Sequence, residues 1–229
     1  MSQETNPPPP MQSAASQPWN EVWISAITRP SVETFEDFVR YPDATANRGY
    51  KWIFIAGLAA TILGFLISLA ITSISSGGSP DPYSITGLFG TSIYFLVCAA
   101  PISAVLGVVG LMISAGISQF FASALGGTGT YSKLAYAFAA YYAPLSIITG
   151  LLTAIPILNC LAFPLGIYGI VLNVIANKAV NQFSWGKAIA SSVVIIAGIL
   201  VLVAVCVIVI LALLGPAIGN VFSNIVTDI

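Results

Sequence analysis

The chain contains four long stretches without a charged residue, and they constrain its fold more than any motif. No Asp, Glu, Lys or Arg occurs in residues 52–80, 82–132, 134–177 and 188–227. About 20 apolar residues span the hydrocarbon of a bilayer, whereas a soluble helix exposes a charged face within a few residues. With 57% hydrophobic and 7% charged residues among 229, the chain is predicted to be an all-α, polytopic membrane protein.

The composition also excludes several kinds of chemistry. Histidine is absent, which excludes Ser-His triads, imidazole zinc sites and His-based phosphoryl transfer. The net charge is −1, and without a basic stripe we expect no nucleic-acid partner. Cys98, Cys160 and Cys206 each lie inside an apolar stretch, so we interpret them as small buried hydrophobes. We therefore expect no metal, no cofactor and no catalytic residue.

The N-terminal region has two predicted parts. Residues 1–17 are polar and proline-rich, so they are predicted to be disordered, and they do not resemble a signal peptide. Residues 18–51 are predicted to form a cytoplasmic amphipathic segment. Its first helix begins at Pro18 and places one apolar face in the headgroup region; this face comprises Trp19, Val22, Trp23, Ala26 and Ile27. A second helix, capped by Ser31, turns Val32, Phe35, Phe38 and Val39 toward the bilayer or the bundle.

Five transmembrane helices are predicted within residues 52–214. Their approximate ranges are 52–74, 93–124, 134–155, 158–178 and 188–214. Pro101 is expected to kink or restart the second helix, which follows a short interfacial or re-entrant stretch at residues 84–91. Gly215-Pro216 is expected to end the last span, and residues 215–229 to form an outer amphipathic tail.

The positions of the basic residues predict the orientation. Arg29, Arg40, Arg48 and Lys51 precede the first span, and Lys133 follows the second. Lys178 and Lys187 lie between the fourth and fifth spans. The loop between the first and second spans, the loop between the third and fourth spans and the C-terminal tail have no basic residue. Basic residues are enriched on the cytoplasmic side of membrane proteins. We therefore predict a multi-pass protein of the cell membrane with its N-terminus in the cytoplasm and its C-terminus outside.

The polar residues inside the predicted spans are amides and hydroxyls rather than ionisable groups. Gln119 lies in the second span, and Asn173 and Asn177 lie in the fourth. Because Gly169, Asn173 and Asn177 follow at four-residue spacing, they share one helix face. This face is either a hydrophilic patch for an ion or a lipid headgroup, or a set of interhelical hydrogen bonds. Each such bond contributes roughly 0.6 kcal/mol.

Further patterns leave alternatives open. Small residues at four-residue spacing, such as Ala56, Ala60 and Gly64, indicate close helix packing within one chain or between two copies. Tyr141 and Tyr142 belong to a group of tyrosines that forms an interfacial aromatic belt or a binding surface. The segments that begin at Pro101 and Pro144 are a weak internal repeat or two ordinary proline kinks. Gly126 and Gly127 are expected to form a tight loop, not a phosphate-binding loop.

Several short motifs together resemble a known family. They are Arg29-Pro30, Thr34-Phe35, Gly126-Gly127 and Tyr141-Tyr142-Ala143-Pro144, in a chain with five predicted spans. Residues 19–214 resemble the prokaryotic branch of the Ypt-interacting-protein (Yip) domain family. The resemblance implies a five-helix fold. Eukaryotic members act in membrane trafficking and bind Rab-type GTPases through an N-terminal cytosolic region, but their Asp-Leu-Tyr-Gly-Pro motif does not occur in this sequence. A Rab-type partner is therefore not expected.

The predicted function follows from two interfacial helices and the lack of a catalytic set. We expect a non-enzymatic membrane scaffold, a trafficking-like assembly partner or a lipid-organising factor. Its expected partners are the lipid bilayer and either a second copy or another membrane protein. The alternative is a small transporter or channel for a neutral or lipidic substrate, which would use Asn173, Asn177 and the proline-kinked spans. That alternative predicts a continuous polar cavity reaching the middle of the membrane.

Overall fold

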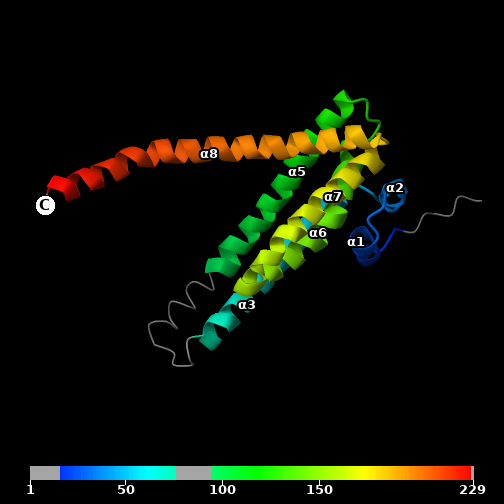
Figure 1. Ribbon diagram of the computed structural model, residues 1–229. Helices are drawn as coiled ribbons and strands as arrows, with labels where there is room; N and C mark the ends of the chain where they lie inside the picture. Colours follow the sequence, from blue (N-terminus) through cyan, green and yellow to red (C-terminus); the bar gives the residue numbers. More distant parts are fainter. Residues whose placement is uncertain (1–15, 76–93, 228–229) are drawn as a thin grey trace, which may run out of the picture.

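The computed structural model describes residues 16–75 and 94–227, and every regular element in these ranges is helical (Figure 1). The elements are α1 (Trp19–Thr28), α2 (Val32–Arg40), α3 (Ala46–Ser75), the π-helical turn η1 (Phe95–Ala99), α5 (Ala100–Ala124), α6 (Tyr131–Ala154), the 3₁₀ turn η2 (Pro156–Leu161), α7 (Ala162–Asn181) and α8 (Trp185–Thr227). The all-α prediction is confirmed. The predictions for residues 1–15 and 84–91 lie outside the described residues.

Among the described residues, four helices are long and apolar enough to cross a membrane. They comprise Ala46–Ile71, Val97–Ala124, Tyr131–Ala154 and Pro156–Asn181. These ranges contain most of the first four predicted spans, which supports a multi-pass membrane protein. The fifth predicted span falls in α8, where the described apolar stretch Ala204–Gly215 is shorter. The number five therefore stays a prediction.

Helix α8 continues through Gly215-Pro216 to Thr227. The prediction that the last helix ends at this dipeptide was wrong. A proline removes only one backbone donor, and membrane helices tolerate such a gap because local adjustments satisfy the freed carbonyl. The amphipathic face predicted for residues 215–229 depends on Val221, Phe222 and Ile225, whose side chains are outside those described.

Helices α3 and α6 pack closely along their length because small residues face each other. A Cβ atom added at Gly49 would lie 3.0 Å from the Cβ of Ala139. One added at Gly150 would lie 3.0 Å from the Cβ of Ala60 and 3.2 Å from its carbonyl oxygen. Backbones approach this closely in membranes only where side chains are small. The small-residue pattern of these two helices is thus explained by packing within one chain.

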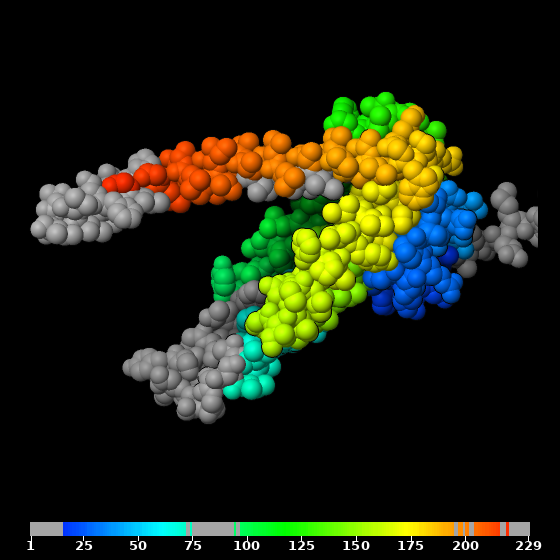
Figure 2. Space-filling model, viewed as in Figure 1, coloured from blue at the N-terminus to red at the C-terminus, as the bar shows by residue number. Residues whose placement is uncertain are grey.

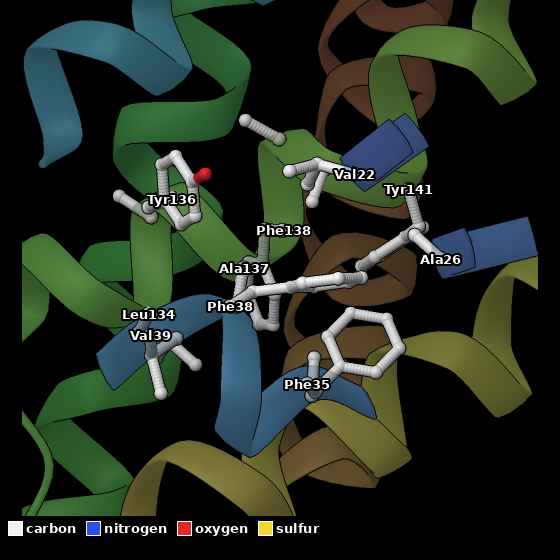
Figure 3. Close-up of a cluster of buried hydrophobic side chains, with 14 of the residues drawn as sticks. Val22, Ala26, Phe35, Phe38, Val39, Leu134, Tyr136, Ala137, Phe138 and Tyr141 are labelled. Atoms are coloured by element: carbon white, nitrogen blue, oxygen red, sulfur yellow. The ribbon is translucent and has the colours of Figure 1, made fainter. Parts of the chain in front are cut away.

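The N-terminal helices cover the first turns of α6 (Figure 3), and α2 packs mainly against α7. Their buried side chains are Val22 and Ala26 from α1, and Phe35, Phe38 and Val39 from α2. They pack against Leu134, Tyr136, Ala137, Phe138 and Tyr141 of α6. Of the apolar face predicted for α1, Val22 and Ala26 are buried on the bundle rather than in headgroups, whereas Trp19 is 55% exposed. The interfacial position predicted for α1 is therefore not confirmed.

Arg48 connects this N-terminal segment to the bundle. Its guanidinium forms an ion pair with Asp43 and donates to the backbone carbonyl of Gln17. It also lies 5.0 Å from the ring centroid of Trp52 and 6.0 Å from that of Tyr136. The side chains of Arg48 and Asp43 are 22% and 28% exposed. Such partly buried, charge-assisted contacts hold residues 16–28 on the bundle more firmly than a surface ion pair would.

We expect Arg48→Ala to loosen α1 selectively. Losing the charge-assisted bonds costs about 1–2 kcal/mol locally, so amide hydrogen exchange in α1 should accelerate about tenfold. Arg40→Ala is the matched control, because Arg40 is 73% exposed and pairs only with Glu36 and Asp37 on its own helix. Equal exchange rates in the two variants would contradict the role of Arg48.

Candidate functional site

Asn177 lies at the centre of a hydrogen-bond network between helices. It is fully buried, and its Oδ1 accepts from the Ser118 hydroxyl at 2.8 Å. Its Nδ2 donates to the Oδ1 of Asn173 and to the Ser192 hydroxyl, both at 3.2 Å. Ser118 belongs to α5 and Ser192 to α8. A single asparagine of α7 therefore connects α7 to two other helices.

The network extends in both directions along α7. Towards the middle of the bundle, the Nδ2 of Asn173 donates to the Tyr141 hydroxyl of α6 at 3.1 Å. Towards the end of α7, the Nε2 of Gln119 donates to the Oδ1 of Asn181 at 3.3 Å and to the carbonyl of Gly129 at 2.8 Å. The Nδ2 of Asn181 in turn donates to the Asn177 carbonyl at 3.3 Å. Four of the predicted candidates, Gln119, Tyr141, Asn173 and Asn177, thus lie in one connected group.

Sequence reasoning missed three members of this network: Ser118, Asn181 and Ser192. Asn181 continues the four-residue spacing of Asn173 and Asn177, so that pattern alone pointed to it. No comparable signal marked the two serines, because their role depends on which helices are neighbours. The Oε1 atom of Gln119 is buried without a hydrogen-bond partner.

Gly126 and Gly127 lie beside the Gln119 end of the network, in the loop between α5 and α6. Gly126 has φ +84°, a conformation that non-glycine residues rarely adopt. A Cβ atom at Gly127 would lie 2.7 Å from the Phe183 ring and 2.8 Å from the Oδ1 of Asn181. The tight loop predicted for these glycines is present, and it presses against the corner between α7 and α8.

Tyr142 and Pro144 lie outside the network. Tyr142 is 48% exposed and lines a cavity of about 640 Å³ between α5, α6 and α7. The wall of this cavity also includes Asn173, whereas Gln119, Asn177 and Pro144 do not line it. The remaining wall is mainly apolar or small, so the cavity is not the continuous polar path that a channel requires.

The network consists of neutral amides and hydroxyls, which determines what it can do. These groups donate and accept hydrogen bonds but do not exchange protons readily near neutral pH. Most of their capacity is used between helices, which agrees with the interhelical interpretation of Asn173 and Asn177. The network therefore fixes the relative positions of α5, α6, α7 and the start of α8.

We expect Asn177→Leu to destabilise the bundle by about 1–2 kcal/mol. Leucine has a similar shape but removes the bonds to Ser118 and Ser192, each of which contributes about 0.6 kcal/mol or somewhat more. Thermal unfolding in detergent micelles should show the loss. Thr153→Val is the control, because the Thr153 hydroxyl bonds only to carbonyls of its own helix. An equally small effect of both substitutions would rule out a stabilising role for the network.

Comparison with known families identifies the chain. The family model described as the Yip1 domain matches residues 24–208, which include the four candidate spans, the network and the start of α8. No curated protein and no solved structure matches the chain. The match agrees with the family resemblance of its short motifs. This membrane protein belongs to the Yip1 domain family.

Proposed function

We propose that this protein is a non-enzymatic scaffold of the membrane, which acts as a trafficking-like assembly partner or a lipid-organising factor. One observation carries the proposal: the amides inside the spans form hydrogen bonds with hydroxyls and amides of neighbouring helices. Residues used in this way hold the helices in position. They leave the outer surfaces of the bundle as the parts that act on other molecules.

Helix α1 provides one such surface. Trp19 and Ile24 are 55% and 60% exposed, while Val22 and Ala26 anchor the helix to α6. Figure 2 shows α1 and α2 as a lobe on the side of the bundle. Exposed tryptophan and isoleucine next to a membrane suit the headgroup region or an apolar patch of another membrane protein. The scaffold would therefore engage its partner through this lobe.

Photocrosslinking tests the proposal in intact membranes. A benzophenone amino acid at Trp19 or Ile24 should form adducts with a protein or a lipid, which mild-detergent purification and mass spectrometry identify. The same group at Glu21, an exposed charged position of α1, serves as the matched control. A solitary monomer without adducts or co-purifying lipid would refute the scaffold role.

The proposed orientation has the N-terminus in the cytoplasm and the C-terminus outside. Its support is that the helix ends carrying basic residues lie together. The Ala46 amide donates to the Ser132 hydroxyl at 2.9 Å, and the Lys187 ammonium donates to the Leu125 carbonyl at 2.8 Å. These bonds place the start of α3, the α5–α6 loop and the start of α8 at one end, which the preference for cytoplasmic basic residues assigns to the inside.

We expect a phosphatase reporter fused after Ile229, active only outside the cytoplasm, to be active. A fluorescent protein that folds only in the cytoplasm should fluoresce when fused before Met1. A cytoplasmic reporter that works after Ile229 would overturn the orientation and with it the fifth span.

A second candidate is a transporter for a neutral or lipidic substrate. It is favoured by Asn173 and Tyr142, which place an amide and a phenol on the wall of an otherwise mainly apolar cavity. Reconstituted liposomes would show flux of a fluorescent lipid or a neutral solute above that of protein-free vesicles. Flux at the background level in both assays would reject this candidate.

A further inference from the structure

Beyond its first turns, α8 has no buried side chain among those that the structure describes. Its first turns are seated on the bundle, where Ala188, Ser191 and Ser192 are buried. From Val193 to Gly215, in contrast, every described side chain is exposed. Figures 1 and 2 show the helix leaving the bundle beyond its first turns. The described side chains of this long uncharged helix are therefore exposed to its surroundings.

The bundle has an uncovered groove directly below the point where α8 departs. This groove is the cavity of about 640 Å³, walled by α5 and α7 and floored by α6. Ser192 lines one end of it, so the groove continues the interface that seats the first turns of α8. A Cβ atom added at Gly110 or Gly166, on opposite walls, would have no atom within 4 Å. Walls of this kind admit a helix at close range.

Among the described side chains of the chain's own α8, Ser192 lines this groove and those beyond it do not. The direction of α8 is set by buried first turns, by the Asn177–Ser192 hydrogen bond and by the Lys187 bond to the Leu125 carbonyl. The helix then continues without interruption to Thr227. An unbroken helix keeps the direction of its seated turns, because bending it over the groove would break backbone hydrogen bonds in the hydrocarbon.

We propose that α8 of a second copy occupies the groove, and that two copies exchange these helices in a twofold dimer. Each copy carries both unpartnered surfaces, both are uncharged, and reciprocal exchange satisfies both at once, as a twofold interface requires. The groove extends along α7 from Ala162 to Asn173, about 17 Å at 1.5 Å per residue. The exposed part of α8 is about twice as long, so it can span the full length of the groove.

The exchange is compatible with a bilayer. Figure 1 shows α8 inclined to the other helices. When α8 lies along the bundle of its partner, the two bundles are inclined to each other by the same angle. If the twofold axis runs along the membrane normal, each bundle tilts away from the normal by half of the angle between the two bundles. Such a tilt is acceptable, because transmembrane helices commonly tilt by about 20°. The inference names a partner for the proposed scaffold, but it does not depend on α1.

Disulfide crosslinking between two tagged copies tests the exchange. One copy keeps only Cys206 on α8, and the other, without native cysteines, carries Gly166→Cys in the groove. In two further experiments, the copy with Cys206 is replaced by a copy whose single cysteine is Leu200→Cys or Leu213→Cys. These positions sample other heights along α8. The matched control is Ile167→Cys, at the same depth on α7 but outside the groove and 50% exposed. We expect crosslinks between the copies to be at least several-fold stronger with Gly166→Cys than with the control.

Two results would overturn the proposal. One is crosslinking that is absent with Gly166→Cys, or no stronger with it than with the Ile167→Cys control, from all three α8 positions. The other is crosslinking that occurs only when both cysteines are on one chain, because the chain's own α8 would then cover the groove.

Filling the groove provides an independent measurement. Gly110→Leu and Gly166→Leu add side chains where the protomer has open space, so folding should be unchanged while the dimer fraction in native mass spectrometry falls at least tenfold. Gly186→Leu, also in open space but outside the groove, should keep the dimer. An unchanged dimer fraction, or loss of co-purified lipid alone, would refute the exchange.

If the exchange fails while adducts at Trp19 persist, the scaffold role stands. If the adducts are also absent, both proposals fail.

Discussion

Gly150→Leu should be among the most damaging single substitutions in this protein, with a loss of about 3 kcal/mol in the free energy of unfolding. The first added carbon would lie 3.0 Å from the Cβ of Ala60 and 3.2 Å from its carbonyl oxygen. Because the neighbour includes backbone, the clash is relieved only by moving α3 away from α6. Overpacking of this kind typically costs 1–3 kcal/mol, and a long side chain directed at a backbone belongs at the upper end.

Equilibrium unfolding in mixed micelles should show this loss. Gly186→Leu is the control, since a Cβ atom there would have nothing within 4 Å and leucine favours the helix. If both variants lost the same stability, the close approach of α3 and α6 would not be what the bundle depends on.

Gly129→Ala should cost about 2–3 kcal/mol although it adds only one methyl group. That methyl would lie 2.7 Å from the carbonyl oxygen of Val180 and 2.7 Å from the Oδ1 of Asn181. Relief requires the loop to move off the end of α7, which also breaks the hydrogen bond from Gln119 to the Gly129 carbonyl. The substitution therefore combines a steric clash with the loss of one end of the network.

Thermal unfolding and hydrogen exchange at the end of α7 would measure this effect. The control is Thr128→Ala, a change of an exposed residue in the same loop, which should stay within about 0.5 kcal/mol of the parent. A Gly129→Ala variant as stable as this control would show that the loop adapts freely.

The spans were predictable because hydrophobic stretches and their borders are local properties. The third predicted span, residues 134–155, corresponds to α6 at Tyr131–Ala154. Pro101 marks the transition from η1 to α5, as expected for a residue without a backbone donor. The first transmembrane helix, α3, begins earlier than predicted, at Ala46, because helical hydrogen bonding continues through Arg48 and Lys51 at the polar end of the span. Hydropathy marks where the hydrocarbon begins, not where the helix does.

The candidate site was predictable only in part, because its membership depends on contacts between helices. The spacing of Asn173 and Asn177 identified a polar face, but not that Ser118 and Ser192 complete it. Tyr141 and Tyr142 are adjacent in sequence yet point about 100° apart on a helix. Both line the groove, but only Tyr141 is buried and bonded to Asn173, whereas Tyr142 is 48% exposed. Val22 and Ala26 suited either lipid or protein, and their burial against the bundle follows from the packing of α1 on α6, which the sequence alone does not contain.

The position of the Asn177 network has a mechanical consequence. Its bonds between spans lie in the half of the bundle that carries the basic residues. Directional bonds resist sliding and spreading of helices, whereas contacts between small apolar residues yield more readily. The bundle is therefore stiffer at one membrane surface than at the other. Changes in bilayer thickness or lateral pressure should be absorbed mainly at the compliant end, while the basic end, with the N-terminal lobe, keeps its shape.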